Sequence, residues 1–253
     1  SEVTAGVSIE ECRDLVCAAR RSKGKYMMAE NYAYMKPNIL VRELVRHGLF
    51  GEIYYAEGAY IHELKQHNED TPWRRHWQTG VNGCTYPTHS LGPVLRWFEG
   101  ERVVAVCGMG TGHHYKDPRD NFYEMEDSVT MMCRLSSGAQ VQIRVDMLSD
   151  RPHNMVHYAL QGTDGCYEST DGHKSVPKIW LRSRSENVQW EPLEELEEEF
   201  LPEFWKNPPE EALKAGHGGG DYWEVQDFVT AIREEGEPPI GIDLAMDMTL
   251  PGL

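Results

Sequence analysis

The segment best suited to acid–base chemistry covers residues 83–93, where a tyrosine and a histidine flank a proline. Pro87 restricts Tyr86 to extended backbone geometry, and Thr88 can provide the N-cap of the helix that follows. His89 then lies in the first helical turn, beside the positive end of the helix dipole, which favours the neutral imidazole that a general base needs. From spacing alone, a buried histidine that bonds only to backbone fits the same pattern.

Polar and aromatic side chains also occupy residues 30–34, directly after the apolar run at 25–29. That run is predicted to form a buried strand, and residues past the carboxyl end of a strand in an open α/β sheet face the ligand crevice. Asn31 and Tyr34 could therefore orient a ring or donate a proton to a ligand. A loop whose tyrosines close the core is the alternative.

The glycine run at 216–220 contains one functional side chain, that of His217. Successive glycines let a backbone approach a ligand closely or bend sharply. His217 is therefore a candidate ligand contact, although a plain flexible linker fits the composition equally well.

Two patterns imitate cofactor or metal sites without meeting their requirements. Residues 108–112 have glycine at every second position, which imitates the start of a dinucleotide-binding loop. The third glycine is not at the required spacing, and no helix with an acidic residue about 20 positions on follows. Adjacent histidines point apart on a strand, and carboxylate or cysteine partners are not at helical spacing. We therefore expect no catalytic metal at the histidines outside the segments above, which include His113, His114, His153, His157 and His173.

Two helices are expected near the start of the chain. Ser8 and Glu11 form a capping box that predicts the first helix, and Gly24 is expected to end it in the left-handed conformation. Pro37 suits the first turn of the second helix, which Gly48 is expected to close.

Further helices are expected at 88–98 and from Asp221 onward. Glu224 would complete a capping box for this last helix. Its predicted apolar face consists of Tyr222, Val225, Phe228, Val229 and Ile232. The Glu- and Pro-rich residues 191–211 are predicted to form an exposed excursion.

Period-two patterns predict strands at 52–61, 102–107, 127–135, 139–147, 155–161 and 177–182. Residues 136–138 carry a hairpin signal between two of these strands. Consecutive, hairpin-linked strands favour an α+β fold: a large, mostly antiparallel mixed sheet with helices on one face, preceded by a βα remnant of another domain.

The composition excludes several classes of partner. The 253 residues carry a formal net charge of −16, so counterion release gives no gain on nucleic acid, and no basic face could hold an anionic membrane. No apolar stretch approaches the roughly 20 residues that span a bilayer. We expect neither a nucleic-acid nor a membrane partner.

The six cysteines are dispersed and form no CxxC pair, as is typical of reduced, buried thiols in a cytoplasmic protein. The chain begins at Ser1 without a methionine, so an export signal upstream of this residue is compatible with the sequence.

Several stretches together resemble the Gfo/Idh/MocA oxidoreductase family, in the right order and over nearly the whole chain. They are Ser1-Glu2-Val3 with the capped helix after it, KYMMAENYAYMKPN, GLFGEIYYAEGAY, TYPTHSLGPV and GHGGGDYWEVQDFV. The resemblance implies an N-terminal Rossmann domain that binds NAD or NADP. Residues 1–30 would be the end of that domain, and residues 31–253 would form the substrate-binding and oligomerisation domain.

The same resemblance implies a cofactor and a partner. The intact protein would use NAD or NADP, whereas this fragment lacks the phosphate-binding loop and is not expected to bind either tightly. Glu2 falls on the Glu of the family's Glu-Lys-Pro motif, so Glu2 and Asn31 are expected to face the cofactor. The open face of the family's sheet usually makes an oligomer contact, which predicts a homodimer or homotetramer.

Three positions depart from the common sugar dehydrogenases of this family. Val3 stands at the position of the catalytic Lys, while Thr85 and Gly92 stand at two Asp positions around the retained His89. The Tyr-Pro-Thr-His run and the Glu-Asn pair before it look instead like the NAD-dependent α-N-acetylgalactosaminidases and their relatives.

That subgroup resemblance implies roles for individual residues. His89, Tyr86 and Tyr34 map onto catalytic positions, while Tyr158 and His217 map onto sugar contacts. The polar stretch at 63–82 adds one further substrate-binding candidate, Arg74.

Three functions follow as hypotheses. The first is the C-terminal, substrate-binding part of an NAD(P)-dependent oxidoreductase that acts on a sugar or sugar derivative. The second, which the subgroup resemblance implies, is an NAD-dependent glycosidase. It would oxidise the sugar at C3, a base would remove the acidified neighbouring proton, the glycosidic oxygen would leave, water would add, and the cofactor would return its hydride to the sugar. The third, motivated by the missing Lys and Asp residues, is a non-catalytic sugar-binding or assembly subunit.

Overall fold

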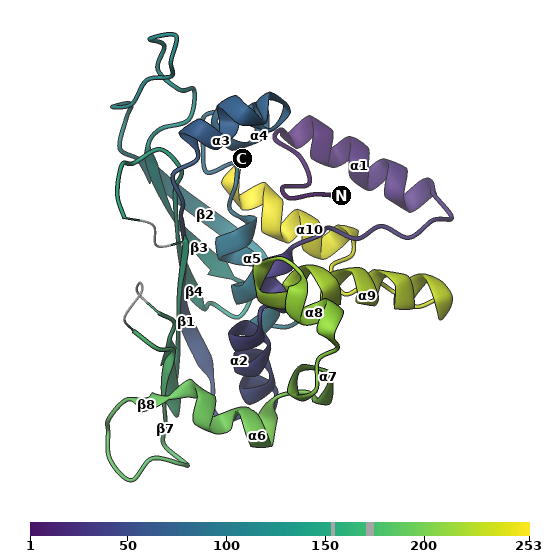
Figure 1. Cartoon of the computed structure of the whole chain (residues 1–253), viewed down its shortest axis with the longest axis vertical. Coiled ribbons are helices and arrows are strands. Elements are labelled where there is room, and N and C mark those ends of the chain that lie inside the picture. The colour runs from purple at the N-terminus through teal and green to yellow at the C-terminus, as the bar shows by residue number, and fades with distance from the viewer. Residues whose placement is uncertain (153–154, 171–174) are drawn as a thin grey trace.

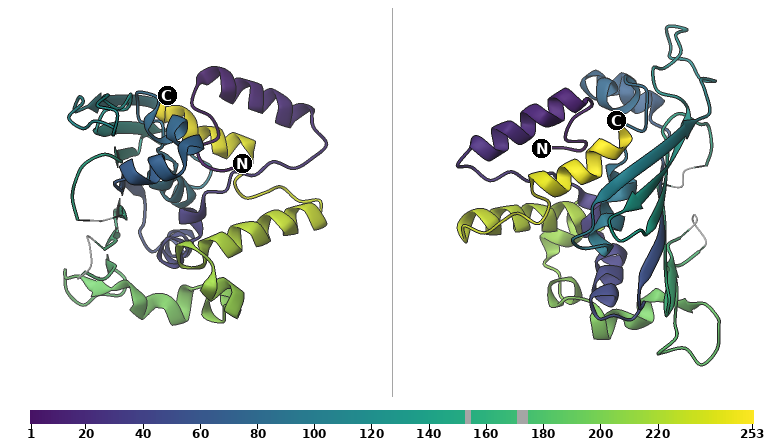
Figure 2. Two further views of the ribbon diagram at one scale, coloured as in Figure 1. Left: turned by 45° about the horizontal axis from the view of Figure 1, so that its top comes forward. Right: turned by 180° about the vertical axis from the view of Figure 1, so that it is seen from behind.

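The computed structural model describes residues 1–152, 155–170 and 175–253. Within these ranges, one eight-stranded sheet carries helices on one face and is open on the other (Figure 1; Figure 2, right). The strand order is β2-β3-β4-β1-β5-β6-β7-β8. β1 pairs with β4 in parallel, and the other described neighbours are antiparallel. The predicted α+β fold with a mostly antiparallel sheet is therefore confirmed.

The strands are β1 Ile53–Ile61, β2 Val103–Gly110, β3 Ser128–Leu135, β4 Gln140–Asp146, β5 Met155–Gly162, β6 Gly165–Glu168, β7 Lys178–Leu181 and β8 Glu191–Pro192. The predicted strands and the 136–138 hairpin are present. β6 and β8 were not predicted, because four and two residues are too few to show a period of two.

Side-chain alternation decides which face of the sheet carries the core. On β4, Val141, Ile143 and Val145 are fully buried, whereas Gln140 is exposed and Gln142 is half-buried. β3 has the same alternation. Because successive side chains of a strand point to opposite faces, the helices must cover the face that holds the valines.

The longer helices lie together on that face (Figure 2). They are α1 Ile9–Arg21, α2 Lys36–Arg46, α5 Thr88–Trp97, α9 Gly220–Arg233 and α10 Ile242–Thr249. Two shorter helices, α3 Lys65–Asp70 and α4 Arg75–Thr79, form within the polar stretch at 63–82. Among the described residues, no helix combines the length and apolar character needed to cross a membrane.

The ends of α1 and α2 agree only partly with prediction. Ser8 caps α1 by accepting a hydrogen bond of 3.1 Å from the backbone N–H of Glu11, as predicted. The predicted glycine end of α1 was wrong: Ser22 is the extended C-cap, and its hydroxyl accepts the N–H of Gly24, which is not left-handed. Gly48 does close α2 with a φ of 73°.

Of residues 25–29, Met27 and Met28 are buried as predicted and the others are half-buried, but the segment does not form a strand. The backbone N–H of Met28 donates to the carbonyl of Ile240, and that of Ala29 donates to the carbonyl of Ser1. A strand needs a ladder with one continuous neighbour. Here the backbone groups find separate partners, so the segment is extended without joining the sheet.

The prediction of an exposed excursion at 191–211 was right only in part, because most of these residues are exposed or half-buried but the segment is helical and packs on the core. These residues form η3 Leu193–Leu196, α6 Glu197–Phe200, α7 Glu203–Lys206 and the start of α8 Glu210–Lys214. Leu193, Leu201 and Trp205 are buried in the core. Glutamates dominate the composition, but each short helix turns its few apolar side chains inward.

The predicted capping box of α9 is also wrong. α9 begins one residue earlier, after Gly219 in the left-handed conformation, and no side chain caps it. Asp221 cannot serve as the N-cap because its carboxylate bonds with Asn31 and His217.

The inward face of α9 differs from the predicted one. Glu224 and Ala231 are buried, whereas Val225 and Ile232 are 55% and 52% exposed. Apolar side chains surround most of this helix, so the pattern did not identify which side packs inward. α10 follows it and was not predicted, which corrects the expectation that α9 is the last helix.

α5 begins at the predicted place but without the predicted cap. Pro87 is the N-cap, and its carbonyl accepts the backbone N–H groups of Ser90 and Leu91. Thr88 is the first helical residue, and its buried hydroxyl has no partner among the described residues. His89 nevertheless lies in the first turn, as predicted.

α5 approaches β1 closely because Gly58 has no side chain. A Cβ atom at Gly58 would lie 2.1 Å from the carbonyl oxygen of Ser90, far inside van der Waals contact. Ser90 directly follows His89, so this contact fixes how far the backbone of His89 lies from β1.

We predict that Gly58→Ala forces α5 away from β1 and lowers the free energy of unfolding by about 1–3 kcal/mol, the usual range for overpacking. Urea unfolding followed by circular dichroism measures the change. Gly236→Ala is the matched control, because a Cβ there meets no atom within 4 Å. Equal unfolding midpoints for the two variants would contradict the role of Gly58.

Candidate active site

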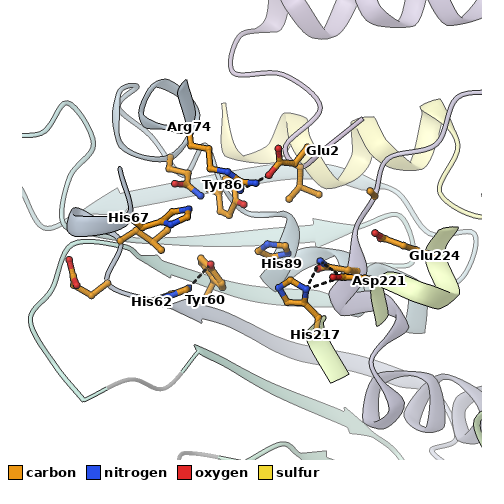
Figure 3. A pocket seen from close by; sticks show the side chains of 16 residues that line it. Glu2, Tyr60, His62, His67, Arg74, Tyr86, His89, His217, Asp221 and Glu224 are labelled. Atoms are coloured by element: carbon orange, nitrogen blue, oxygen red, sulfur yellow. Dashed lines mark hydrogen bonds and ion pairs between the residues drawn. The ribbon is translucent and has the colours of Figure 1, made fainter. Parts of the chain in front are cut away.

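A cavity of about 610 Å³ opens where the N-terminal segment, the end of β1, α5 and the start of α9 meet (Figure 3). The residues between β1 and α4 form a further wall. Of the eight predicted site residues, six line this cavity: Glu2, Asn31, Arg74, Tyr86, His89 and His217. Segments far apart in the sequence thus bring most of the predicted residues together.

His89 and Glu30 form a buried pair in the wall of this cavity. His89 Nδ1 lies 3.0 Å from Glu30 Oε1, and the glutamate is fully buried. The backbone N–H of Tyr32 donates to the same oxygen at 3.2 Å. Because an ionised carboxylate only accepts hydrogen bonds, it favours a proton on Nδ1 and leaves the Nε2 lone pair of the neutral ring free. His89 is thereby prepared to act as a base.

Gly92 makes room for this pair. A Cβ atom at Gly92 would lie 2.6 Å from Cγ of Glu30. Gly92 is the position where the resemblance leads one to expect an Asp three residues after the histidine. In this chain the carboxylate beside His89 comes instead from the segment that precedes η1 Asn31–Tyr34.

Three tyrosine rings surround the imidazole of His89. Their centroids lie 4.2 Å (Tyr32), 5.0 Å (Tyr60) and 5.3 Å (Tyr86) from the histidine ring. Burial raises the pKa of all three phenols, that of Tyr86 to about 12. The hydroxyls therefore stay protonated at neutral pH and can donate hydrogen bonds, which leaves His89 as the base.

Tyr158, predicted to contact the sugar, lies behind His89 instead of in the cavity wall. Its hydroxyl donates to the backbone carbonyl of His89, and the residue is 2% exposed. Burial raises the pKa of this phenol well above its ordinary value, so the donor proton is retained. Tyr158 thus ties the first turn of α5 to β5.

Tyr34 was predicted to be catalytic, but it does not line the cavity that holds His89 and Tyr86. It lines a separate cavity together with Arg42 and Asp227. Residues two apart in a 3₁₀ helix point about 120° away from each other. Within η1, Tyr32 therefore faces His89 while Tyr34 faces the second cavity.

Asp221, His217 and Asn31 form a second polar cluster in the cavity wall, drawn with dashed lines in Figure 3. Asp221 Oδ1 accepts a hydrogen bond of 2.8 Å from Asn31 Nδ2 and lies 2.8 Å from His217 Nδ1. Gly218 and Gly219 are left-handed, with φ of 64° and 97°. The glycine run thus forms a sharp bend, which is one of the two roles predicted for it.

Arg74 pairs with Glu2 on the side of the cavity away from His217 (Figure 3). Arg74 Nη1 lies 2.5 Å from Glu2 Oε1, and its guanidinium lies 4.5 Å from the centroid of the Trp73 ring. The fixed positive charge of Arg74 is therefore already balanced within the protein.

Several cavity residues were missed by sequence reasoning. His62 directly follows β1, and its Nδ1 lies 2.8 Å from the hydroxyl of Tyr60. Glu224 lines the cavity from α9. The position just past the carboxyl end of a strand could have identified His62. Glu30 and Glu224 stood in patterns that were noticed, but no local pattern shows that Glu30 contacts His89 or that Glu224 faces the cavity.

Within the described ranges, no group of three or more His, Cys, Asp or Glu side chains is placed to hold a metal ion. His114 pairs with Asp127, its Nδ1 lying 2.6 Å from Oδ2. His153 and His173 lie outside the described residues.

Comparison with known proteins gives matches over most of the chain. The model of the family "Glycosyl hydrolase 109, C-terminal domain" matches residues 34–250. A glycosyl hydrolase family 109 protein of Saccharopolyspora erythraea is 30% identical over 94% of this chain and 54% of its own length. An alpha-N-acetylgalactosaminidase of Shewanella oneidensis is 30% identical over 92% of this chain and 55% of its own length. The chain spans a little over half the length of these relatives.

Solved structures with the same fold are more distant in sequence. An NAD binding oxidoreductase from Klebsiella pneumoniae has a TM-score of 0.75 at 17% identity, covering 98% of this chain and 68% of that one. A levoglucosan dehydrogenase in complex with NADH has a TM-score of 0.73 at 18% identity, covering 99% and 68%. These likenesses agree with the Gfo/Idh/MocA resemblance in fold. The family match extends from η1 through α10, and the chain therefore belongs to the glycosyl hydrolase 109 C-terminal domain family.

Proposed function

We propose that this chain is the substrate-binding part of an NAD(P)-dependent enzyme that cleaves a glycoside by oxidation and elimination. The observation that carries the proposal is the buried His89–Glu30 pair in a cavity lined with protonated tyrosines. Family membership supports the glycosidase, as does the departure of Val3 and Gly92 from the relay of common sugar dehydrogenases.

In the proposed reaction, Nε2 of His89 accepts the proton from the sugar carbon next to the oxidised C3, while Glu30 balances the charge that forms on the imidazole. The glycosidic oxygen then leaves with a proton, and water adds to the double bond that its departure forms. Tyr86 donates a hydrogen bond to a sugar oxygen from its protonated hydroxyl. On the opposite wall of the cavity, His217 and Asp221 bind hydroxyl groups of the sugar. Tyr158 holds the backbone of His89 in place, so the base cannot move away as the proton is transferred.

The relatives' names suggest which sugar to test first. One relative is an alpha-N-acetylgalactosaminidase, which supports an α-linked N-acetylgalactosamine as a substrate of the whole protein. The cavity, at about 610 Å³, has ample volume for a monosaccharide unit.

Glu2 and Asn31 would face the cofactor. Asn31 Oδ1 is buried without a partner among the described residues, and it would accept the N–H of a carboxamide such as that of nicotinamide. When bound, the cofactor would accept a hydride from the sugar and return it after elimination. We do not expect tight NAD or NADP binding to this chain alone.

The open face of the sheet is the proposed oligomer contact, forming a homodimer or homotetramer. It carries half-buried side chains such as Met132, Gln142 and Arg144 without a covering layer of helices (Figure 2, right). We also propose a cytoplasmic location for the intact protein, which the six cysteines without disulfide partners support. Only Cys12, Cys84 and Cys133 are buried as predicted.

In the intact protein, His89→Ala should lower turnover roughly 10²–10⁴-fold, because the base is lost. The assay follows release of p-nitrophenol from its α-N-acetylgalactosaminide with NAD present. His76→Ala is the matched control, since His76 is exposed outside the cavity. Unchanged turnover in His89→Ala would rule out His89 as the base. Net cofactor reduction without p-nitrophenol release would favour a dehydrogenase, and sugar binding without either would favour a non-catalytic subunit.

Replacing Glu30 should change the tautomer of His89. Methionine is close to glutamate in size but cannot strongly accept the Nδ1 proton, so Glu30→Met should shift the neutral ring toward the Nε2–H form. Ring ¹⁵N chemical shifts of histidine-labelled chain measure this, with His62 as the internal control. Retention of the Nδ1–H form in Glu30→Met would show that the carboxylate does not set the tautomer.

A charge on the open sheet face should weaken the proposed oligomer. Met132→Glu places an unpaired carboxylate where two faces would meet, so we expect a shift toward monomer in sedimentation velocity. Ile9→Glu is the control, because Ile9 is exposed on α1, on the helical side of the sheet. Identical sedimentation of Met132→Glu and the unaltered chain would exclude this face.

A further inference from the structure

Glu224 is a cavity carboxyl group without an ion-pair partner among the described residues. It is 8% exposed, it lines the cavity from the second turn of α9, and its Oε2 has no hydrogen-bond partner within the described ranges. Figure 3 shows its carboxyl group directed from α9 toward the centre of the cavity. The other carboxylates that line or border the cavity bond to His89, to His217 and Asn31, to Arg74 or, in the case of Glu63, to Lys65.

The surroundings of Glu224 disfavour its ionised form. Burial is the largest cause, followed by the negative charges of Asp221 on the same helix and Glu30 before η1, and together they raise the pKa of Glu224 to about 8. The amino group of Ser1 opposes them. Among the remaining charged or titratable groups that line the cavity, Glu2 and Arg74 balance each other, and His89 and His217 face Glu30 and Asp221. Glu63 pairs with Lys65, and His62 lies against the hydroxyl of Tyr60. His67 and Tyr86 complete the set.

A carboxyl group that keeps its proton has a donor that a carboxylate lacks. The carboxylates of Glu30 and Asp221 can only accept hydrogen bonds, so they cannot satisfy the lone pairs of a ligand oxygen. A protonated Glu224 can do so, as buried neutral carboxylic acids do in other active sites. An anionic ligand group would meet no unpaired fixed positive charge, because Arg74 is already bound to Glu2.

We propose that Glu224 acts as a neutral carboxylic acid that donates a hydrogen bond to an uncharged oxygen of the bound sugar, so that the cavity selects neutral sugars over anionic ones. This role rests on the proposed function for the identity of the ligand as a sugar. Glu224 on α9 would thus determine specificity, in addition to the roles of His89 and Tyr86 at the start of α5.

The protonation of Glu224 is tested directly in the whole chain. The side-chain carboxyl ¹³C signals of glutamate-labelled chain are followed by NMR from pH 4 to 10, and Glu224→Gln assigns the signal that disappears. We expect this signal to titrate near pH 8. Titration near the ordinary glutamate value of about 4.3 would overturn the proposal.

The contact with sugar is tested by the pH dependence of binding. If only the acid form donates to the ligand, affinity for N-acetylgalactosamine follows the protonated fraction, which falls about 30-fold between pH 6.5 and pH 9.5 for a pKa of about 8. NMR titrations with N-acetylgalactosamine at these two pH values measure it. Galacturonate, an anionic sugar of similar shape, should bind more weakly at both.

Two variants separate Glu224 from the other titrating groups. Glu224→Gln keeps a donor without a titration, so its affinity should no longer show the 30-fold loss. Glu224→Met removes the donor and should bind weakly at both pH values. The same pH dependence in Glu224→Gln as in the unaltered chain would overturn the proposal, as would equal affinities of the unaltered chain at pH 6.5 and 9.5.

Failure of this proposal and failure of the proposed reaction give different results. Absence of N-acetylgalactosamine binding at pH 6.5 in the unaltered chain would overturn the assigned ligand of Glu224. The role of His89 as a base depends on turnover of the intact protein, which this binding experiment does not measure.

Discussion

The hydrogen bond between His89 and Glu30 is the contact on which the geometry of the site depends. A fully buried carboxylate is costly unless it receives hydrogen bonds, and here a histidine ring and the backbone N–H of Tyr32 both bond to Oε1 of Glu30. Oε2 has no partner among the described residues. The pair can form only because Gly92 leaves space for the glutamate and Gly58 lets α5 lie against β1. The fold around α5 therefore supports one orientation of the histidine ring.

Most charged side chains of the cavity have a partner of opposite charge or a histidine beside them. Arg74 is matched by Glu2, His217 lies against Asp221, and His89 lies against Glu30. With the tyrosines protonated by burial, the cavity presents mainly hydrogen-bonding groups and few unpaired charges. Such an environment suits a neutral polyhydroxylated ligand, because each hydroxyl needs both a donor and an acceptor once water is removed.

Most of the sheet was predictable, because helices cover only one of its faces. Buried and exposed side chains therefore alternate along each strand, which gives the sequence a period of two. The 136–138 turn and the glycine that closes α2 were also predictable, because the left-handed backbone conformation at Gly138 and Gly48 favours glycine. α9 was less predictable. Its apolar residues occur on most sides, so contacts with η1 and α8 decide that Glu224 and Ala231 face inward. In the same way, glutamates masked the buried residues of 191–211.

For the site, the sequence by itself determined that Tyr86 and His89 flank a proline and that His89 lies in a first helical turn. Both are local properties of a few adjacent residues. Only the tertiary structure decided that Glu30 is the partner of His89, that Tyr32 instead of Tyr34 lies against it, and that Tyr158 stands behind it. Glu30 and His89 are 59 residues apart, and no local periodicity encodes a contact at that separation, because it exists only after α5 and η1 pack together.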